Sequence, residues 1–250
     1  MINIKFHQPP TTFVGEVNLK VLDIDRSIKF YEDIIGFNVL ERTDRNASLT
    51  TDGKNVLLTI EQPDEVVPKS GRTTGLYHFA LLLPKRSDLA SIVRHFAEKG
   101  VQFGSSDHLV SEAIYLSDPD GNGIEIYSDR DPCKWNWNNN EVEMTTIQLD
   151  FNNLLEEAYQ ESWKGLPVET VMGHIHLHVP ELEKTEEFYI EGLGFNVVNR
   201  YGSQALFISD NNYHHHIALN TWAGVGAPTP SLKSVGLKSF SIVFPNEAVR

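Results

Sequence analysis

Short apolar runs of β-rich composition recur along the chain and alternate with stretches of helical spacing. The strand-like runs begin near Gly15, Gly75, Gly173 and Gly236. After three of them, apolar residues follow at helical spacing, over Ile28–Ile35, Leu89–Ala97 and Lys184–Ile190. Gly36 and Gly194 supply helix stops. Further strand candidates come after the first helix, over Val39–Arg42, Ala47–Thr51 and Asn55–Ile60. The pattern predicts an α+β fold built from four βαβββ modules.

Two pairs of segments show that the chain is internally duplicated. Ser27–Val39 reads SIKFYEDIIGFNV and Thr185–Val197 reads TEEFYIEGLGFNV, so both contain FY, four residues and GF. Gly75–Pro84 (GLYHFALLLP) likewise matches Gly236–Pro245 (GLKSFSIVFP). The two pairs are separated by 158 and 161 residues. An internal repeat of this period means that each half of the chain holds two modules.

The repeat predicts two domains. The first covers residues 12–130 and holds modules 1 and 2, and an acidic, partly helical linker follows over residues 131–170. The second domain covers residues 171–250 and holds module 3 and the start of module 4. Too few residues remain before Arg250 for the rest of module 4, so this module is expected to be incomplete.

Composition and charge restrict the classes of partner. The formal net charge is −13, which argues against a nucleic-acid backbone or an anionic membrane surface as the partner. We find no signal peptide near the N-terminus and no stretch of 18 apolar residues. Cys133 is the only cysteine and excludes an intrachain disulfide, which fits a reducing compartment. We therefore expect a cytoplasmic protein that binds a small molecule; a homo-oligomer stays open.

Three features together resemble one protein family. They are the four βαβββ modules, the FY-x4-GF motif after the first strand, and Asp118–Glu125, which reads DPDGNGIE. The chain resembles the vicinal oxygen chelate (glyoxalase/bleomycin resistance/dioxygenase) superfamily over about residues 15–130 and 170–250. Within it, the chain is similar to the two-domain type I extradiol dioxygenases of the catechol 2,3-dioxygenase type. The resemblance implies an enzyme with a divalent metal in a cavity clasped by two modules.

The resemblance also implies the metal ligands. The first-strand frame of the superfamily is ligand-x-x-Leu-x-Val, which places His78 and His174 as ligands, and Glu125 is the last-strand carboxylate. Two imidazoles and one carboxylate suit Fe(II), with Mn(II) as the alternative. Better-known extradiol enzymes draw their ligands from modules 3 and 4, whereas Glu16 of module 1 and Ser239 of module 4 stand at the frame positions here. We therefore expect modules 2 and 3 to share the cavity and modules 1 and 4 to form a degenerate pair. Taken singly, His78 or His174 is more readily explained as an ordinary half-buried strand histidine; the matching frames together with Glu125 favour the metal site.

Three further residues resemble the family's acid–base and substrate-contacting groups. His215 lies in an element similar to His-x-[Val/Leu]-Ala, which implies the acid–base role. Adjacent strand residues face opposite sides, so His214 and His216 compete with His215 for this role. The resemblance implies that Tyr115 contacts the substrate; the alternative is that Tyr115 is an ordinary aromatic side chain of the core. His108 resembles the histidine that reaches the substrate hydroxyl, although its spacing to Glu125 looks about two residues short.

The expected function is therefore extradiol cleavage of catechol or a substituted catechol, an oxidoreductase reaction of aromatic degradation. Both atoms of O2 enter the product, a ring-opened semialdehyde acid. A glyoxalase-like metal-dependent isomerase or transferase and a metal-free drug-resistance binding protein are the alternatives on this fold. Ala218 stands where an isomerase would carry a second glutamate, which favours the oxygenase. The sequence leaves the ring substituents open.

Overall fold

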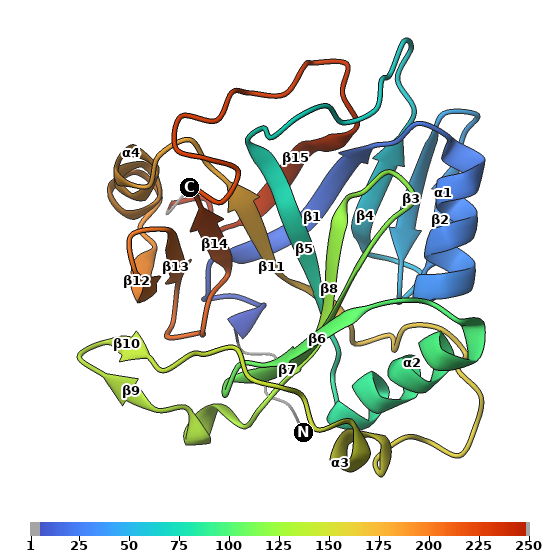
Figure 1. The fold of residues 1–250 in the computed structure, drawn as a ribbon, viewed down its shortest axis with the longest axis horizontal. Helices are drawn as coiled ribbons and strands as arrows, with labels where there is room; N and C mark the ends of the chain where they lie inside the picture. Colours follow the sequence, from blue (N-terminus) through green and yellow to red (C-terminus); the bar gives the residue numbers. More distant parts are fainter. Residues whose placement is uncertain (1–5, 249–250) are drawn as a thin grey trace.

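The computed structural model describes residues 6–248 and contains three complete βαβββ modules (Figure 1). Module 1 comprises β1 (Phe13–Lys20), α1 (Ile24–Phe30), the π-helical turn η2 (Tyr31–Ile35), β2 (Asn38–Arg42), β3 (Asn46–Thr50) and β4 (Val56–Glu61). Module 2 comprises β5 (Gly75–Leu82), α2 (Arg86–Lys99), β6 (Gly104–Asp107), β7 (Ser111–Ser117) and β8 (Gly123–Asp129). Module 3 comprises β11 (Val171–His178), α4 (Glu183–Glu187), the π-helical turn η4 (Phe188–Gly192), β12 (Asn196–Tyr201), β13 (Ala205–Ser209) and β14 (Ile217–Asn220). Among the described residues, module 4 consists of β15 (Gly236–Val243).

Each of the two large sheets combines strands from both halves of the chain. The eight-stranded sheet has the order β12-β13-β14-β11-β5-β8-β7-β6, and the five-stranded sheet has the order β15-β1-β4-β3-β2. The first strands of modules 2 and 3, β5 and β11, run antiparallel side by side at the centre of the larger sheet (Figure 1). Module 2 therefore shares a sheet with module 3, and module 1 shares one with β15. The proposed division into domains at residues 12–130 and 171–250 stays a prediction.

The FY-x4-GF motif forms a helix that widens into a π turn and ends at a glycine. In module 1, Asp23 caps the start of α1 by accepting from the backbone N–H of Arg26. Gly36 ends the helix in the left-handed conformation, at φ 97°, and its Cα approaches Gly165 so closely that a side chain would clash. The buried Tyr31 of the motif donates a hydrogen bond of 2.9 Å to Asp118. The motif thus holds the DPDG turn that leads into β8.

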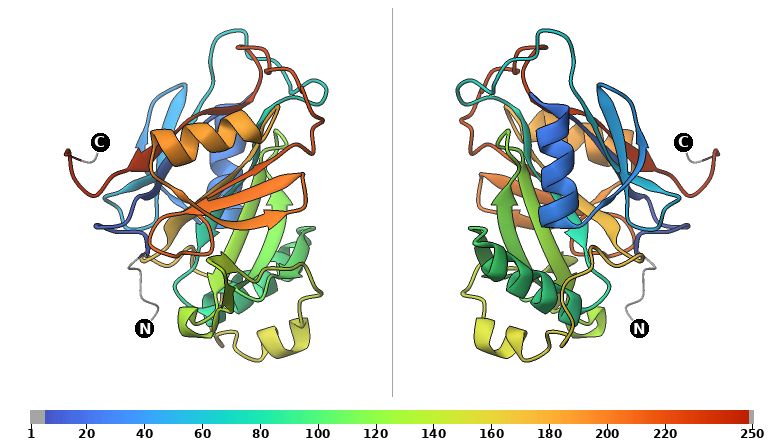
Figure 2. Two further views of the ribbon diagram at one scale, coloured as in Figure 1. Left: turned by 90° about the vertical axis from the view of Figure 1, so that its left-hand side faces the viewer. Right: turned by 90° about the vertical axis from the view of Figure 1, so that its right-hand side faces the viewer.

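The helices lie outside the sheets, and the apolar core contains residues of both. Figure 1 shows α4 and α1 on opposite sides of the molecule, and Figure 2 shows both of them above α2 and α3 (Phe151–Leu155). The linker over 131–170 also contains η3 (Pro132–Lys134) and the hairpin of β9 (Trp137–Asn138) and β10 (Glu141–Val142). Trp135 and Val142 of this linker pack with Phe6 and Tyr213 in a separate small core. None of the helices formed by residues 6–248 has the length and apolar character needed to cross a membrane.

Candidate metal centre

Three adjacent strands bring His78, Glu125 and His174 together on one face of the larger sheet. His78 lies on β5, Glu125 on β8 and His174 on β11. Ala80 of β5 pairs with Glu125 on one side and with His174 on the other. His78 shares the face of Ala80 because side chains two residues apart on a strand point the same way. Ala80 itself is fully buried between the strands that carry Glu125 and His174.

The distances between the three side chains fit a divalent ion. Oε2 of Glu125 lies 3.0 Å from Nε2 of His78 and 3.1 Å from Nε2 of His174, and the two nitrogens are 3.4 Å apart. An ion with bonds of about 2.1 Å holds adjacent ligand atoms about 3.0 Å apart in octahedral geometry and about 3.4 Å apart in tetrahedral geometry. Among residues 6–248, these three form the one group of three or more histidine, cysteine or acidic residues whose ligand atoms all lie within 4.8 Å of one another.

The electrostatics of the site also suit a metal. All three side chains are buried. Burial alone would raise the pKa of Glu125, but His174 and His78 lie against the carboxylate and hold its pKa well below the usual range. Burial lowers the pKa of His174 to about 4, against the opposing effect of Glu125. An ionised carboxylate beside a neutral imidazole is the protonation state in which these groups bind metals.

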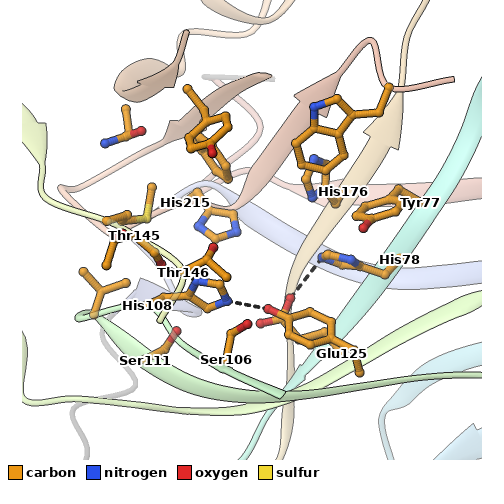
Figure 3. A pocket seen from close by; sticks show the side chains of 17 residues that line it. Tyr77, His78, Ser106, His108, Ser111, Glu125, Thr145, Thr146, His176 and His215 are labelled. Carbon is orange, nitrogen blue, oxygen red and sulfur yellow. Dashed lines mark hydrogen bonds and ion pairs between the residues drawn. The ribbon is translucent and has the colours of Figure 1, made fainter. Parts of the chain in front are cut away.

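A cavity of about 350 Å³ opens beside the centre (Figure 3). His78 and Glu125 form part of its wall, so a metal held between the ligands would face the cavity. Seventeen residues line it: Tyr77, His78, Ser106, His108, Val110, Ser111, Tyr115, Glu125, Met144, Thr145, Thr146, His176, Asn199, Tyr201, Phe207, His215 and Trp222. The volume is typical of a small-molecule site.

Of the histidine triplet, His215 alone lines the cavity. Its ring centroid lies 4.1 Å from that of His174. His214 is fully buried and bonds to Asp129 through Nε2 at 2.9 Å, and Nε2 of His216 donates to the backbone carbonyl of Phe6 at 2.8 Å. The three rings therefore differ in what they contact: His214 and His216 are held by other parts of the core, and His215 faces the cavity.

A chain of hydrogen bonds runs from Asp129 to His215. The carboxylate of Asp129 only accepts, so neutral His214 donates to it through Nε2 and keeps an unprotonated Nδ1. That Nδ1 lies 2.8 Å from Nδ1 of His215, which therefore donates. Neutral His215 is left with an unprotonated Nε2. Burial, followed by the neighbouring His174, lowers the pKa of His215 well below its usual value, which keeps the ring neutral.

Tyr115 and His108 form a second hydrogen-bonded pair in the cavity wall. Tyr115 of β7 pairs in register with Glu125 of β8. Nδ1 of His108 donates to the backbone carbonyl of Thr145 at 2.6 Å, so in the neutral ring Nε2 accepts from the Tyr115 hydroxyl, also at 2.6 Å. Burial and then Glu125 raise the pKa of Tyr115 well above 10, so its hydroxyl keeps its proton. Tyr115 thus lies beside Glu125, and one hydrogen bond links it to His108.

The structure adds residues that the sequence interpretation did not single out. Asp129 lies four residues after Glu125 on β8, but nothing local links it to the distant His214. Thr145, Phe207 and Trp222 reach the cavity from the linker, from β13 and from the segment after β14. His176 lines the cavity, as alternation from His174 allows, whereas His178 lines a neighbouring cavity and bonds to Asn220. Ala218 is fully buried on β14, beside His176.

Comparisons with known proteins agree with this architecture. A family model described as the glyoxalase/bleomycin resistance protein/dioxygenase superfamily matches residues 14–126. Catechol-2,3-dioxygenase of Bacillus subtilis (strain 168) is 47% identical over 239 residues, which is 94% of this chain and 84% of that protein. Biphenyl-2,3-diol 1,2-dioxygenase 3 of Rhodococcus globerulus is 28% identical over 53% of this chain and 74% of its own length.

A solved structure shows the same fold at low identity. Glyoxalase I from Zea mays superimposes with a TM-score of 0.55 at 17% identity, over 92% of this chain and 74% of that chain. This likeness concerns the fold, whereas the 47% identity along most of the sequence defines the family. The chain belongs to the glyoxalase/bleomycin resistance/dioxygenase superfamily and, within it, to the extradiol dioxygenases of the catechol 2,3-dioxygenase type.

Proposed function

We propose that this protein is an Fe(II)-dependent extradiol dioxygenase that cleaves the ring of catechol or a substituted catechol. Both atoms of O2 enter the product, a ring-opened semialdehyde acid. The observation that carries the proposal is the convergence of His78, Glu125 and His174 within 3.4 Å of one another at the wall of a cavity. Two imidazoles and one carboxylate leave coordination positions open, and bound Fe(II) would supply the redox chemistry that joins a catechol to O2.

His215 is the proposed acid–base residue. Its neutral ring donates through Nδ1 to His214, which leaves Nε2 free to take a proton from a hydroxyl in the cavity. The same nitrogen can return that proton to an oxygen of the product as the ring opens. Asp129 and His214 fix the tautomer and orientation of the ring throughout. No net proton is consumed by this pair of transfers.

Tyr115 and His108 are proposed to hold the substrate. The Tyr115 hydroxyl is protonated and directed at His108, and it lies beside Glu125 in the cavity wall. A substrate oxygen placed between the ligands and this pair could accept from Tyr115 or donate to Nε2 of His108. The burial of the ligands limits access of water, so these hydrogen bonds act in a medium of low dielectric constant.

Two readouts test the proposal. Protein purified without oxygen and loaded with Fe(II) should consume one O2 per catechol, and mass spectrometry with ¹⁸O2 should find both labelled atoms in the ring-opened product. Loading with Mn(II) in parallel identifies the metal that supports turnover. Stoichiometric metal binding without oxygen uptake would instead indicate an isomerase or transferase, and no metal binding would indicate a binding protein. The cytoplasmic location stays a prediction.

A further inference from the structure

The cavity wall carries no cationic side chain. Of the seventeen lining residues, none is lysine or arginine, and Glu125 is the one acid. We propose, on the basis of the proposed dioxygenase function, that this enzyme selects catechols with an uncharged, apolar ring substituent and discriminates against catechols that carry a carboxylate. The substituent would lie along an aromatic wall that extends from the metal centre to the mouth of the cavity.

Ring contacts trace this wall. Phe207 packs edge-on against His215, with centroids 5.1 Å apart, and against His176 at 5.9 Å. Trp222 lies 5.3 Å from both His176 and Tyr77. The wall therefore begins beside the proposed acid–base residue and continues without interruption through rings that contact one another.

The outer end of the wall reaches solvent. Tyr77 is 42% exposed, Trp222 39% and Tyr201 63%, although all three line the cavity. Large exposed aromatic side chains around a cavity mouth offer apolar surface that a bound substituent can cover. Each methylene group buried against such a surface improves binding roughly fourfold, so apolar substituents gain affinity here.

The histidines of the wall do not supply the missing positive charge. Oδ1 of Asn220 accepts from the backbone N–H of Trp222 and from Nδ1 of His178, so its Nδ2 is the end that faces His176. That Nδ2 donates to Nε2 of His176 at 2.9 Å, and a nitrogen that accepts carries no proton.

A carboxylate held along this aromatic wall would therefore lose hydration without a cationic partner. Moving an ionised carboxylate into such surroundings is strongly unfavourable unless a cation or several donors replace the water. The net charge of −13 adds long-range repulsion of the same sign. Lys69 lines a second cavity, which meets the first at Tyr77, His78 and Tyr115, and this lysine is the alternative site for an anionic group.

A matched pair of substrates isolates the charge. 3,4-Dihydroxybenzoate and its methyl ester are close in size and both carry an electron-withdrawing group, but the ester is uncharged. With the Fe(II)-loaded protein we expect kcat/KM to be at least about 100-fold higher for the ester, and higher for 4-methylcatechol than for catechol. Anaerobic calorimetry with the Zn(II)-loaded protein should show the same order in Kd. Equal values for acid and ester, or a preference for the acid, would overturn the proposal.

Variants locate the origin of the selectivity. Tyr201→Arg places a cation at the cavity mouth, and we expect it to shift the acid-to-ester ratio of kcat/KM at least tenfold toward the acid, whereas Tyr201→Gln should not. Lys69→Gln should leave the ratio unchanged; a large shift there would place the substituent in the second cavity and overturn the proposal. If no catechol is cleaved at all, the dioxygenase function fails, and the Kd ratio still decides whether the cavity rejects the charge.

Discussion

The two sheets place equivalent positions in the same geometry but fill them with different chemistry. In the larger sheet, Ala80 pairs with Glu125 on one side and with His174 on the other. In the smaller sheet, Asn18 pairs with Thr59 and with Ser239 in the same pattern. Since Glu16 stands two residues before Asn18, as His78 stands before Ala80, the three ligand positions correspond to Glu16, Thr59 and Ser239.

The difference between the two sets shows what the fold supplies and what the side chains supply. In the larger sheet the three side chains are buried and lie against one another: His78, Glu125 and His174. Ser239 is exposed, and Glu16 is half-buried and accepts a hydrogen bond of 2.6 Å from Thr59. The strand arrangement alone therefore brings three side chains together, but a metal centre also needs imidazole nitrogens and a buried carboxylate beside them.

The largest effect should follow from removing a proposed ligand. Glu125→Ala and His174→Ala should each lower metal affinity by more than about 100-fold, since even supporting residues around a metal are worth about 10- to 100-fold. Fe(II) added in the absence of oxygen should raise the melting temperature of the wild type but not of these variants, because an ion stabilises the folded state only if it binds. Metal content and calorimetric melting measure the two effects.

The smaller sheet supplies the matched controls. Glu16→Ala, Thr59→Ala and Ser239→Ala alter the equivalent positions and should leave metal content and the Fe(II)-dependent rise in melting temperature unchanged. Loss of metal from the Glu16 variant would show that the smaller sheet holds the centre. Full retention of iron by either ligand variant would contradict the assignment of that ligand.

Replacing the proposed acid–base residue should reduce turnover and leave the metal in place. We expect His215→Gln to bind Fe(II) stoichiometrically and to lose roughly 10²- to 10⁴-fold in kcat with little change in KM, the usual value of a positioned proton donor. Steady-state oxygen uptake and iron analysis measure this. His216→Gln is the control, because His216 contacts Phe6 and does not line the cavity. Loss of iron together with activity would make His215 a ligand or its support.

A smaller reduction should follow from breaking the hydrogen-bond chain behind His215. Asp129→Asn can donate to His214 and reverse both tautomers, so we expect kcat to fall roughly 10- to 1000-fold at near-normal KM. Nitrogen-15 NMR of labelled histidines in the Zn(II)-loaded protein should show His215 changing from the Nδ1–H to the Nε2–H tautomer. Tyr213→Phe keeps the ring, removes the 3.3 Å bond to Asp129 and the 2.6 Å bond to the Tyr127 hydroxyl, and should change neither readout. An equal loss in both variants would indicate a purely structural role for Asp129.

The sequence predicted the modules and the candidate ligands because both depend on local pattern. Strand and helix periodicity, the FY-x4-GF repeat and the DPDG turn are each contained in a few residues, and the frames place His78 and His174 at matching positions. Modules 2 and 3 do share a sheet, as the ligand frames required. The pairing of strands from distant segments was inferred only through the resemblance to a family.

The remainder of the site could not be predicted because it depends on long-range packing. Asp129 and His214 are 85 positions apart, and neither residue type signals that the other is its partner. Phe207, Trp222 and Thr145 reach the cavity from three separate segments, where alternation says only which side a residue faces. The widening of each FY helix into a π turn likewise has no distinct signature in apolar spacing.

The smallest predicted effect tests how the smaller sheet supports the larger one. Tyr31, from the FY motif of module 1, is fully buried and donates to Asp118 at the turn before Glu125. Asp118 also accepts from the backbone N–H groups of Asp120 and Asn122, so the turn keeps its shape when one donor is lost. Tyr31→Phe should therefore lower the free energy of unfolding by about 2 kcal/mol, the usual value of a hydrogen bond to a charged group, as measured by urea denaturation.

Metal affinity should stay within about threefold of wild type in Tyr31→Phe, because the hydrogen bond supports the turn and not the ligand atoms. Tyr189→Phe is the matched control: Tyr189 is the motif tyrosine of module 3 and is also buried, and burial is what raises its pKa to about 12. We expect Tyr189→Phe to lower the free energy of unfolding by less than Tyr31→Phe does, because burial without a charged partner gives the Tyr189 hydroxyl less interaction energy to lose. A large drop in metal affinity in the Tyr31 variant alone would show that the DPDG turn sets the position of Glu125, and that the sheet without ligands directly governs the one that carries them.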